Sequence, residues 1–485
     1  MPKAIIIGAG VAGIASAIRL AVKGFEVEVF ESNAYPGGKL SEIVIDGYRF
    51  DAGPSLFTMP QYVEELFHLA GKNPLEYFSY YKLSSICNYF YEDGTRLTAW
   101  ADKHKFAREI AGKTADSEHA VHDFLKRSEE IYEITHHVFL EKSLHKIRTY
   151  LNTATLNSLL KIGKIDSLRS MNEANESYFI DQRTTQLFNR YATYNGSDPY
   201  RAPATLNVIP HLEQHFGAYF PKGGMNMITA SLVKLAEELG VKFRYNSKVE
   251  EIVLEDEKVK GIRLQGQLEE ADLVISNMDV WHTYKKLLKN LYVSSRVLNQ
   301  ERSSSALIFY WGINTTFQEL DLHNILFSEH YEAEFRAIWK EKKIFNDPTV
   351  YINISSKYNA SDAPAGCENW FVMINVPANA GQDWDKLIAE ARENVINKIS
   401  RNLNVNLRDY IVCEDILDPR SIESRTSSYQ GSLYGTSSNS RFAAFLRHPN
   451  FSSSIKNLYF VGGSVHPGGG IPLALLSAKI TSELI

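Results

Sequence analysis

Three spaced glycines near the start of the chain have the pattern of a nucleotide-binding turn. Gly8, Gly10 and Gly13 form a GxGxxG sequence that follows the apolar residues 4–7 and opens a run of small residues up to residue 23. This order predicts a strand, a turn and a helix. In such a turn Gly8 permits the tight bend, Gly10 lets the backbone approach a pyrophosphate, and Gly13 lets the helix pack closely on the strand. The helix N-terminus would bind the phosphates, so the pattern predicts a dinucleotide site.

Glu31 is the acidic residue expected at such a site. It follows residues 25–30, which alternate with the period of a strand. A carboxylate at this position accepts hydrogen bonds from the ribose hydroxyls, and its charge repels a 2′-phosphate, which argues against NADP. A glycine-rich turn that binds no nucleotide is the alternative, but strand, turn, helix, strand and acid all agree. These features alone do not separate NAD from FAD.

A second glycine-rich segment, near the C-terminus, favours FAD. Residues 462–472 (GGSVHPGGGIP) contain five glycines and two prolines in eleven residues, a composition that is unfavourable inside regular structure. They separate a strand at 458–461 from a helix over 473–484, and Pro472 is acceptable at the first helical position. Backbone N–H groups of such a loop suit a flat ring, and the helix dipole would stabilise a reduced flavin by about 0.3–1 kcal/mol, or up to about 2 kcal/mol when partly buried. A nicotinamide enzyme needs no such loop, and the sequence has no second GxGxxG for a separate NAD(P)H domain.

Two further segments are expected to return to the nucleotide. The first, GGK at residues 37–39, follows Glu31 closely, and the second, DAGPS at residues 51–55, is another irregular stretch that contains glycine. Either of them could instead be an ordinary turn.

Composition excludes several other classes of protein. The 485 residues include 52 Lys and Arg against 57 Asp and Glu, and this net charge of −5 does not suggest a nucleic-acid partner. Cys87, Cys367 and Cys413 are odd in number and form no CxxC pattern, so they predict no disulfide framework and favour a reducing cytoplasm. The nucleotide turn explains the apolar residues 4–17 better than an export signal does, and no apolar run approaches the ~20 residues that span a bilayer.

The order of these features predicts an α/β protein of two intertwined domains. Between the two glycine-rich ends, residues 228–239 have helical periodicity, 249–254 and 259–264 predict a hairpin, and 273–276 predict a further strand. We expect a Rossmann-like FAD-binding domain with a parallel sheet and an inserted α+β substrate domain. The FAD-binding domain is expected to comprise residues 1–56, 216–280 and 440–485, and the substrate and membrane-associating domain residues 57–215 and 281–439.

Taken together, these segments resemble the bacterial-type carotenoid desaturase family, the flavoproteins related to phytoene desaturase, over the whole chain. Leu473 stands where the commonest family pattern has glycine, and its side chain is expected to shape the edge of the flavin. Residues 190–203 (RYATYNGSDPYRAP) and 369–377 (NWFVMINVP) most resemble the hydroxycarotenoid 3,4-desaturase branch. The motifs that carry the family resemblance are GAGVAG with Glu31, GGK at 37–39, FDAGPSLFTMP at 50–60, FPKGGM at 220–225, ADLVISN at 271–277 and VGGSVHPGGGIPLALLSAK at 461–479.

The resemblance implies non-covalently bound FAD in an amine-oxidase/GDI-like two-domain architecture. It further implies removal of two hydrogens from a C–C bond that adjoins a polyene, by hydride transfer to flavin N5 and loss of a proton. The branch implies 3,4-desaturation of a 1-hydroxycarotenoid; a phytoene-type desaturase and a carotenoid isomerase are the alternatives. An amine oxidase would share the scaffold, but Cys413 lies well before the loop and in no setting for covalent attachment of flavin. The alternative of another class, a non-enzymatic isoprenoid lipid escort protein, fits poorly with intact cofactor motifs.

The residues expected to contact FAD lie mainly in the glycine-rich motifs at the two ends of the chain and in the segments that return to the nucleotide. The expected contacts are Gly8, Gly10, Val11, Ala12, Gly13, Glu31, Ser32, Gly37, Gly38, Lys39, Leu40, Gly53, Pro54, Ser55, Leu56, Val249, Asn277, Gly463, Ser464, Gly470, Ile471 and Pro472.

Three residues are candidates for the chemistry. His466 lies inside the C-terminal loop and is the ionisable residue expected nearest the flavin ring, although it could instead brace the loop through a hydrogen bond. Tyr194 and Asp198 are candidates for contact with a substrate hydroxyl or for taking the proton. The composition of residues 195–199 favours the alternative, a plain turn.

A carotenoid resides in the bilayer, so the resemblance also implies contact with a membrane. Residues 142–169 combine six basic side chains with several leucines, which suits a helix pair that lies on anionic lipid. A solvated basic face over an internal core is the alternative. We expect a cytoplasmic protein that is peripherally associated with the inner face of the cell membrane. Oxygen or a quinone is expected to serve as its diffusible electron acceptor.

Overall fold

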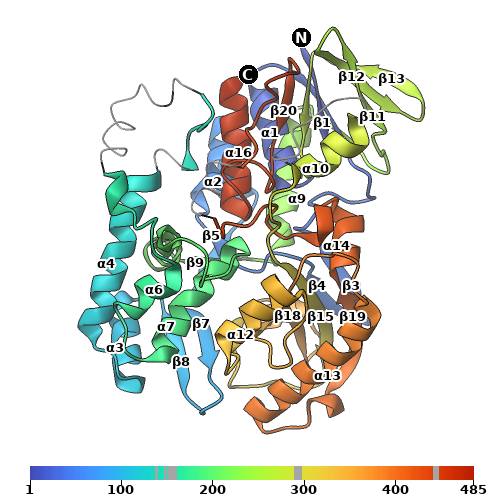
Figure 1. Cartoon of the computed structure of the whole chain (residues 1–485). Helices are drawn as coiled ribbons and strands as arrows, with labels where there is room; N and C mark the ends of the chain where they lie inside the picture. The colour runs from blue at the N-terminus through green and yellow to red at the C-terminus, as the bar shows by residue number, and fades with distance from the viewer. Residues whose placement is uncertain (137–139, 147–148, 150–160, 289–297, 441–446) are drawn as a thin grey trace.

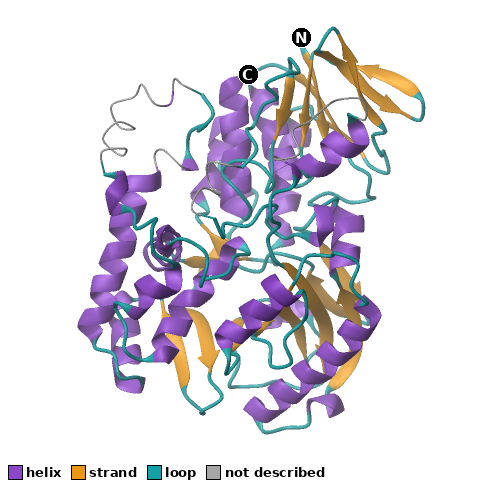
Figure 2. Ribbon diagram, viewed as in Figure 1, coloured by secondary structure: helices purple, strands orange, loops and turns teal. Residues whose placement is uncertain are grey.

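The computed structural model describes residues 1–485 except 137–139, 147–148, 150–160, 289–297 and 441–446. A parallel sheet lies near the two chain termini, and a larger mixed sheet lies at the opposite end of the molecule (Figures 1 and 2). Nearly half of the predicted basic segment at 142–169 falls on residues outside the described ones, so its expected helix pair stays a prediction.

The five-stranded parallel sheet combines three distant parts of the chain. Its order is β10-β2-β1-β14-β20, and every neighbouring pair in it is parallel. A parallel sheet assembled from the start, middle and end of the sequence is what the separated motifs predict. The strands are β1 (Lys3–Ile7), β2 (Glu26–Phe30), β10 (Lys242–Arg244), β14 (Leu273–Ser276) and β20 (Leu458–Phe460).

Strand β1 is covered on both faces, which explains its continuous apolar sequence. Successive side chains of a strand point to opposite faces. Ala4 and Ile6 join a core with helices α1, α9 and α16, whereas Ile5 and Ile7 join a second core that lies under a small antiparallel sheet. The helices are α1 (Val11–Val22), α9 (Asn226–Glu238) and α16 (Ile471–Leu484), and the small sheet contains the predicted hairpin as β11 (Glu251–Glu255) and β12 (Lys258–Leu264), with β13 (Gln267–Glu270).

Helices α1 and α16 pack directly against each other (Figure 1). Each of them follows a strand of the parallel sheet, α1 after β1 and α16 after β20. Since parallel strands all end at the same edge of their sheet, both helix N-termini lie along this edge. Ligands of open α/β sheets bind at this edge, outside the carboxyl ends of the strands.

The second sheet has seven strands in the order β19-β15-β18-β17-β16-β7-β8. The apolar run 306–313 lies in β15, the second strand from one edge of this sheet, which is buried throughout. Trp311, Trp370 and Val372 pack on one face of this sheet against α13 (Trp384–Leu403). The strands are β7 (Ser85–Phe90), β8 (Arg96–Trp100), β15 (Ser305–Ile313), β16 (His323–Leu326), β17 (Val350–Asn353), β18 (Glu368–Val376) and β19 (Ile411–Leu417).

A group of helices flanks the seven-stranded sheet beside β7 and β8 (Figure 1). Among the described residues, no helix is both long enough and apolar enough to cross a membrane. Other helices and strands of the described residues include α2 (Gln61–Leu69), α3 (Lys103–Lys113), α4 (Glu118–Thr135), α6 (Met171–Glu176), α7 (Gln182–Asn189), η5 (Arg190–Asn195), α8 (Val208–His211), η7 (Leu212–Phe216), α10 (Val280–His282), α12 (Tyr331–Arg336), α14 (Pro419–Thr426), β3 (Glu42–Ile45), β4 (Tyr48–Asp51), β5 (Phe57–Thr58), β6 (Tyr80–Lys82) and β9 (Ala218–Pro221).

Candidate functional site

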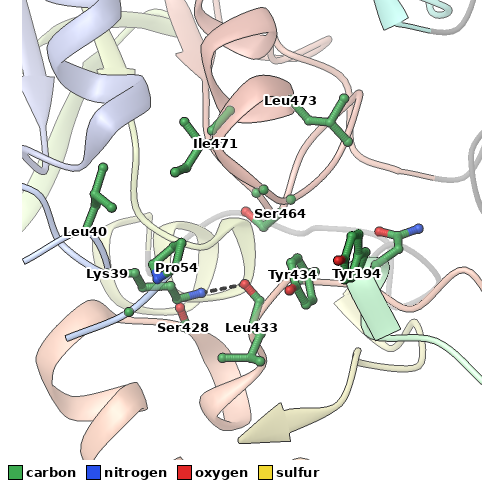
Figure 3. Close-up of a pocket in the computed structure, with 18 of the residues that line it drawn as sticks. Lys39, Leu40, Pro54, Tyr194, Ser428, Leu433, Tyr434, Ser464, Ile471 and Leu473 are labelled. Atoms are coloured by element: carbon green, nitrogen blue, oxygen red, sulfur yellow. Dashed lines mark hydrogen bonds between the residues drawn. The ribbon is translucent and has the colours of Figure 1, made fainter. Parts of the chain in front are cut away.

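A cavity of about 1680 Å³ reaches from the edge of the parallel sheet to the seven-stranded sheet. Pockets for one drug-sized ligand hold about 300–1,000 Å³, so this space is large enough for a cofactor and a second molecule. Figure 3 shows one part of it, with Lys39 and Pro54 on one side and Ile471 and Leu473 of α16 above them.

The N-terminal turn has the geometry that its glycines predict. Gly8 adopts φ +96°, a left-handed conformation that favours glycine, and its N–H donates to the carbonyl of Phe30 (2.8 Å). A side chain on Gly13 would place Cβ 2.2 Å from the Gly8 carbonyl oxygen. Gly13 does not line the cavity; its lack of a side chain lets α1 pack against the preceding turn.

Glu31 is fixed at the end of β2 by backbone donors. Its carboxylate accepts hydrogen bonds from the N–H of Ala9 (2.8 Å), the N–H of Asn33 (2.8 Å) and the hydroxyl of Ser32 (3.2 Å). The side chain is almost fully buried, yet it lines the cavity. The carboxylate is therefore positioned before any ligand binds.

The GGK segment closes over the turn and reaches the far wall of the cavity. Gly37 adopts φ +100°, and its N–H donates to the carbonyl of Ala9 (2.7 Å). Lys39 donates to the carbonyls of Ser432 (3.1 Å) and Leu433 (2.8 Å), the latter marked in Figure 3. Burial lowers the pKa of Lys39 to about 8, and the charge of Asp279 opposes that shift. Lys39 thus joins the N-terminal motif to residues 432–433.

The DAGPS segment packs tightly on GGK. A Cβ on Gly53 would lie 1.8 Å from the Lys39 carbonyl oxygen, so only glycine fits. The next polar residue, Ser55, shares a hydrogen bond of 2.7 Å with the hydroxyl of Tyr351 in β17. This contact links a predicted cofactor segment to the seven-stranded sheet.

Asn277 lies between the two glycine-rich ends of the sequence. Its amide donates to the Gly8 carbonyl (3.3 Å), and its amide nitrogen lies 2.7 Å from where a Cβ on Gly10 would be. The oxygen of the same amide would lie 2.7 Å from a Cβ on Gly462. The two glycine motifs are thus brought together around one side chain.

The C-terminal loop leads into α16 without a side-chain cap. Gly470 is the N-cap residue with φ +100°, and Pro472 lies in the first turn, as its sequence position predicts. Helix α1 likewise has Gly10 at its N-cap and no side-chain cap. Val11, Ala12, Ile471 and Pro472 line the cavity, so two uncapped helix N-termini open onto it. Uncapped helix N-termini favour anionic groups.

Arg447 is a buried cation at this loop that the sequence patterns do not reveal. It is 2% exposed and donates to the carbonyls of Tyr434 (3.2 Å), Gly463 (3.4 Å) and Thr436 (3.0 Å) and to the amide oxygen of Asn195 (3.3 Å). Within the described ranges no carboxylate pairs with it, and burial lowers its pKa to about 10. A buried charge without a counter-ion is costly. Its position in the cavity wall therefore fits a ligand that becomes negative.

His466 lines the cavity as a neutral imidazole. Its Nε2 donates to the carbonyl of Lys142 (2.8 Å), so the other ring nitrogen, Nδ1, is unprotonated. Nδ1 has no hydrogen-bond partner within the described part of the chain. Burial is the main cause that lowers the pKa of His466 to about 4. The Lys142 contact is the bracing hydrogen bond that the sequence left open as an alternative role.

The other two catalytic candidates occupy different positions. Tyr194 lines the cavity, donates to Glu213 (2.7 Å) and accepts from Arg190 (2.7 Å). Asp198 is not part of the cavity wall; its carboxylate accepts from the N–H of Tyr200 (2.9 Å), as in a turn. Burial raises the pKa of Asp198 to about 6.

The predicted cofactor contacts gather in one place. All of them except Gly13 line the cavity, although no pattern predicted the buried polar residues opposite them. Arg190 lies at the start of the segment that resembles the hydroxycarotenoid branch. That position was the one sequence signal for any of these buried polar residues. Glu213, His323, Glu334 and Arg447 occur in no recognisable motif.

Comparison with known proteins identifies the family. Residues 11–485 match the family of flavin containing amine oxidoreductases. The chain belongs to this family. It is 52% identical over 485 residues to a 1-hydroxycarotenoid 3,4-desaturase from Flavobacterium sp. (strain P99-3), with 100% of this chain and 99% of that protein covered. It is also 34% identical over 491 residues to a 4,4'-diapolycopene oxygenase from Methylomonas sp, with 100% and 98% covered.

The fold has counterparts among solved structures. A putrescine oxidase bound to putrescine has a TM-score of 0.65 and 16% identity, over 99% of this chain and 98% of that one. The predictions of a flavin-dependent oxidoreductase, of its α/β fold class and of the resemblance to carotenoid desaturases are confirmed. The domain boundaries and the roles of single residues stay predictions.

Proposed function

We propose that this flavoprotein carries out the 3,4-desaturation of a 1-hydroxycarotenoid. The 52% identity to a protein of that activity extends over the whole chain. The observation that carries the proposal is the shape of one continuous cavity. Residues expected to hold FAD line one part of it, and apolar or aromatic side chains such as Ile86, Ile325 and Phe371 line another. A long apolar substrate would thus meet the cofactor inside the protein.

The residues present fit a dinucleotide with a flavin ring. The N-terminus of α1 and Glu31 would hold the pyrophosphate and the ribose, and the N-terminus of α16 would face the ring. In this proposal residues 1–56, 216–280 and 440–485 form the FAD-binding domain, and residues 57–215 and 281–439 form the substrate domain. When bound, the flavin supplies the acceptor for the hydride that leaves the substrate.

The chain itself would orient the substrate and accept its proton. The apolar walls exclude water and align the reacting bond, which supplies much of the catalysis in such a reaction. His466 lines the cavity, and its buried Nδ1 is unprotonated and has no hydrogen-bond partner among the described residues; a pKa of about 4 makes it a weak base. A weak base suffices here, because the polyene delocalises the positive charge that precedes proton loss. Asp198 is the other candidate base; an unchanged rate of flavin reduction in Asp198→Asn would remove it.

Product analysis tests the proposed reaction. Purified protein would be given an acyclic carotenoid with and without a 1-hydroxyl group, and the products would be identified by mass. Desaturation predicts a loss of two hydrogens from the hydroxylated substrate. An unchanged mass would indicate an isomerase and contradict the proposal, and conversion of only the unhydroxylated substrate would indicate a phytoene-type desaturase.

A carotenoid oxygenase is the second candidate function. The 34% identity to a diapolycopene oxygenase over essentially the full length of both proteins favours it. An oxygenase would add oxygen to its product, and the same mass measurement would show the addition. Incorporation of label from ¹⁸O₂ would support this candidate over desaturation.

We also propose that the protein takes its substrate from the inner face of the cell membrane. Leu140, Ile165 and Leu168 border the cavity, and Leu168 is 72% exposed. Leu140 precedes the basic segment 142–169, and Ile165 and Leu168 lie within it, so an apolar entrance would adjoin a surface attracted to anionic lipid. Flotation with anionic liposomes tests this; no binding, with substrate still converted from detergent, would contradict it. Oxygen or a quinone would then reoxidise the flavin.

A further inference from the structure

A buried polar cluster lies in the wall of the otherwise largely apolar part of the cavity. Arg190 and Glu213 form an ion pair (3.4 Å), and both are almost fully buried. The hydroxyls of Tyr191 (2.5 Å) and Tyr194 (2.7 Å) donate to the same carboxylate. The charges of Arg190 and Glu213 cancel, so the cluster is polar but carries no net charge.

His323 stands beside this cluster with a fixed tautomer. Its Nδ1 lies 3.2 Å from the amide nitrogen of Asn353 and 2.7 Å from the hydroxyl of Tyr351. An amide nitrogen can only donate, so Nδ1 is the acceptor and the ring proton resides on Nε2. Burial lowers the pKa of His323 to about 3, and the charge of Arg190 lowers it further in the same direction. The ring is therefore neutral.

The hydrogen bond between Tyr351 and His323 also fixes which hydroxyl donates in the next hydrogen bond, between Tyr351 and Ser55. Tyr351 donates to His323 Nδ1, so its oxygen accepts from the hydroxyl of Ser55 (2.7 Å). Ser55 belongs to the DAGPS segment, which is expected to contact FAD. The free end of this hydrogen-bonded chain, His323 Nε2–H, is thus two side chains away from the predicted cofactor contacts.

Two buried donors in this wall lack an acceptor. Neither His323 Nε2 nor Arg190 Nε has a hydrogen-bond partner among the residues that the structure describes, and both side chains line the cavity. Unsatisfied buried donors are rare in folded proteins because each one is costly. Each of these two nitrogens exposes less than 1 Å², but their side chains line the cavity, so a small shift of the side chains would bring the donors to a ligand that carries the acceptor.

Few chemical groups could serve as the acceptor for these two donors. A protonated amine has no lone pair and would face two N–H groups, so the site disfavours the substrate class of an amine oxidase. A carboxylate would add a net negative charge that the neutral cluster does not balance. A neutral oxygen at the end of an apolar chain satisfies the donors without adding charge.

We infer that His323 and Arg190, held by Tyr351 and Glu213, bind the hydroxyl oxygen of the substrate and make the enzyme specific for hydroxylated carotenoids. This inference rests on the proposed function, since it deepens the same site. In a 1-hydroxycarotenoid the hydroxyl carbon is only two carbon–carbon bonds from the nearer carbon of the 3,4 bond. A hydroxyl site linked through Tyr351 to Ser55 is near enough to the predicted cofactor contacts to serve that bond.

Equilibrium binding tests the inference independently of turnover. A 1-hydroxylated acyclic carotenoid and its parent without the hydroxyl would be titrated in detergent micelles, and binding would be followed by the absorption shift of the polyene. The wild-type protein should bind the hydroxylated compound more tightly. His323→Phe keeps the ring but removes the donor, and should reduce that preference by roughly 5- to 100-fold, the cost of an unmade buried hydrogen bond. His323→Gln restores an N–H donor and should recover part of the preference.

Matched controls separate this role from a structural one. His211→Phe removes another buried histidine, which lies outside the cavity, and should leave the preference unchanged. Flavin content and melting temperature of each variant would show whether it folds. Equal weakening of both ligands in His323→Phe would overturn the inference. A preserved preference in the binding assay without any desaturation would instead contradict the proposed function and leave the hydroxyl site in place.

Discussion

Replacement of Glu31 by glutamine gives the sharpest test of the nucleotide site. The carboxylate now accepts from two backbone N–H groups, those of Ala9 and Asn33, each at 2.8 Å. The amide that replaces it in Glu31→Gln would keep one oxygen, and its NH₂ group would face one of those donors. The ribose of a bound dinucleotide would then compete for the single oxygen, so the variant should lose a charge-assisted hydrogen bond.

The expected weakening of FAD binding in Glu31→Gln follows from the loss of that one hydrogen bond. Hydrogen bonds to charged groups contribute about 1.5–3 kcal/mol, which corresponds to roughly 10- to 150-fold weaker FAD binding. The dissociation constant would be measured by titration of the apoprotein with FAD, following the quenching of flavin fluorescence. Glu26→Gln is a matched control on the same strand, because Glu26 pairs with Lys242 at the surface.

Two outcomes would refute this reasoning. A Glu31→Gln variant that binds FAD within about twofold of the wild type would show that the carboxylate does not hold the ribose, since the loss of a charge-assisted bond costs more than that. An equal loss in the Glu26 control would show a general effect on the sheet. The melting temperature of each apoprotein would confirm that both variants fold.

Three other perturbations have distinct expected results. Gly13→Ala should force α1 away from the Gly8 carbonyl oxygen, which would lie 2.2 Å from the new Cβ. The variant should lose about 1–3 kcal/mol of unfolding free energy and most of its bound flavin. Normal flavin content would contradict this prediction. Burial raises the pKa of Glu334 to about 7 from a usual 4.5, so the wild type should lose up to about 3 kcal/mol of stability as pH rises from 5 to 8. Glu334→Gln can keep both hydrogen bonds to Thr349 and cannot ionise, so denaturant unfolding should show its stability relative to the wild type rising over that window; a constant difference would refute the assignment. Arg447→Met should shift the flavin midpoint potential negative by on the order of tens of millivolts, since 30 mV corresponds to about 1.4 kcal/mol for two electrons; an unchanged potential would place Arg447 away from the ring.

Local motifs made much of the fold and the cofactor region predictable. Gly8, Gly13 and Glu31 lie within one strand–helix–strand unit, so their spacing alone defines how they meet. The C-terminal loop was readable because glycine and proline in that number exclude regular structure. Both segments then occupy the same edge of the parallel sheet, as their positions after strands predict.

The polar cluster opposite the cofactor segments could not be read in the same way. His323 meets Tyr351 through strand pairing, and Ser55 meets Tyr351 across 296 residues of sequence. Neither contact has a local pattern. Arg447 contacts carbonyl oxygens, which belong to every residue type and leave no trace in the sequence. Such contacts depend on the register of strands and the packing of loops, which a single sequence does not specify.

Anaerobic single turnover tests the central claim most directly. The oxidised flavoprotein would be mixed with a 1-hydroxycarotenoid in the absence of oxygen, with flavin absorbance and product mass followed together. We predict that the flavin loses its absorbance at the rate at which a product lighter by two hydrogens forms, with one product for each flavin. Product that forms while the flavin stays oxidised, or no product until oxygen is admitted and then one that contains added oxygen, would contradict the account.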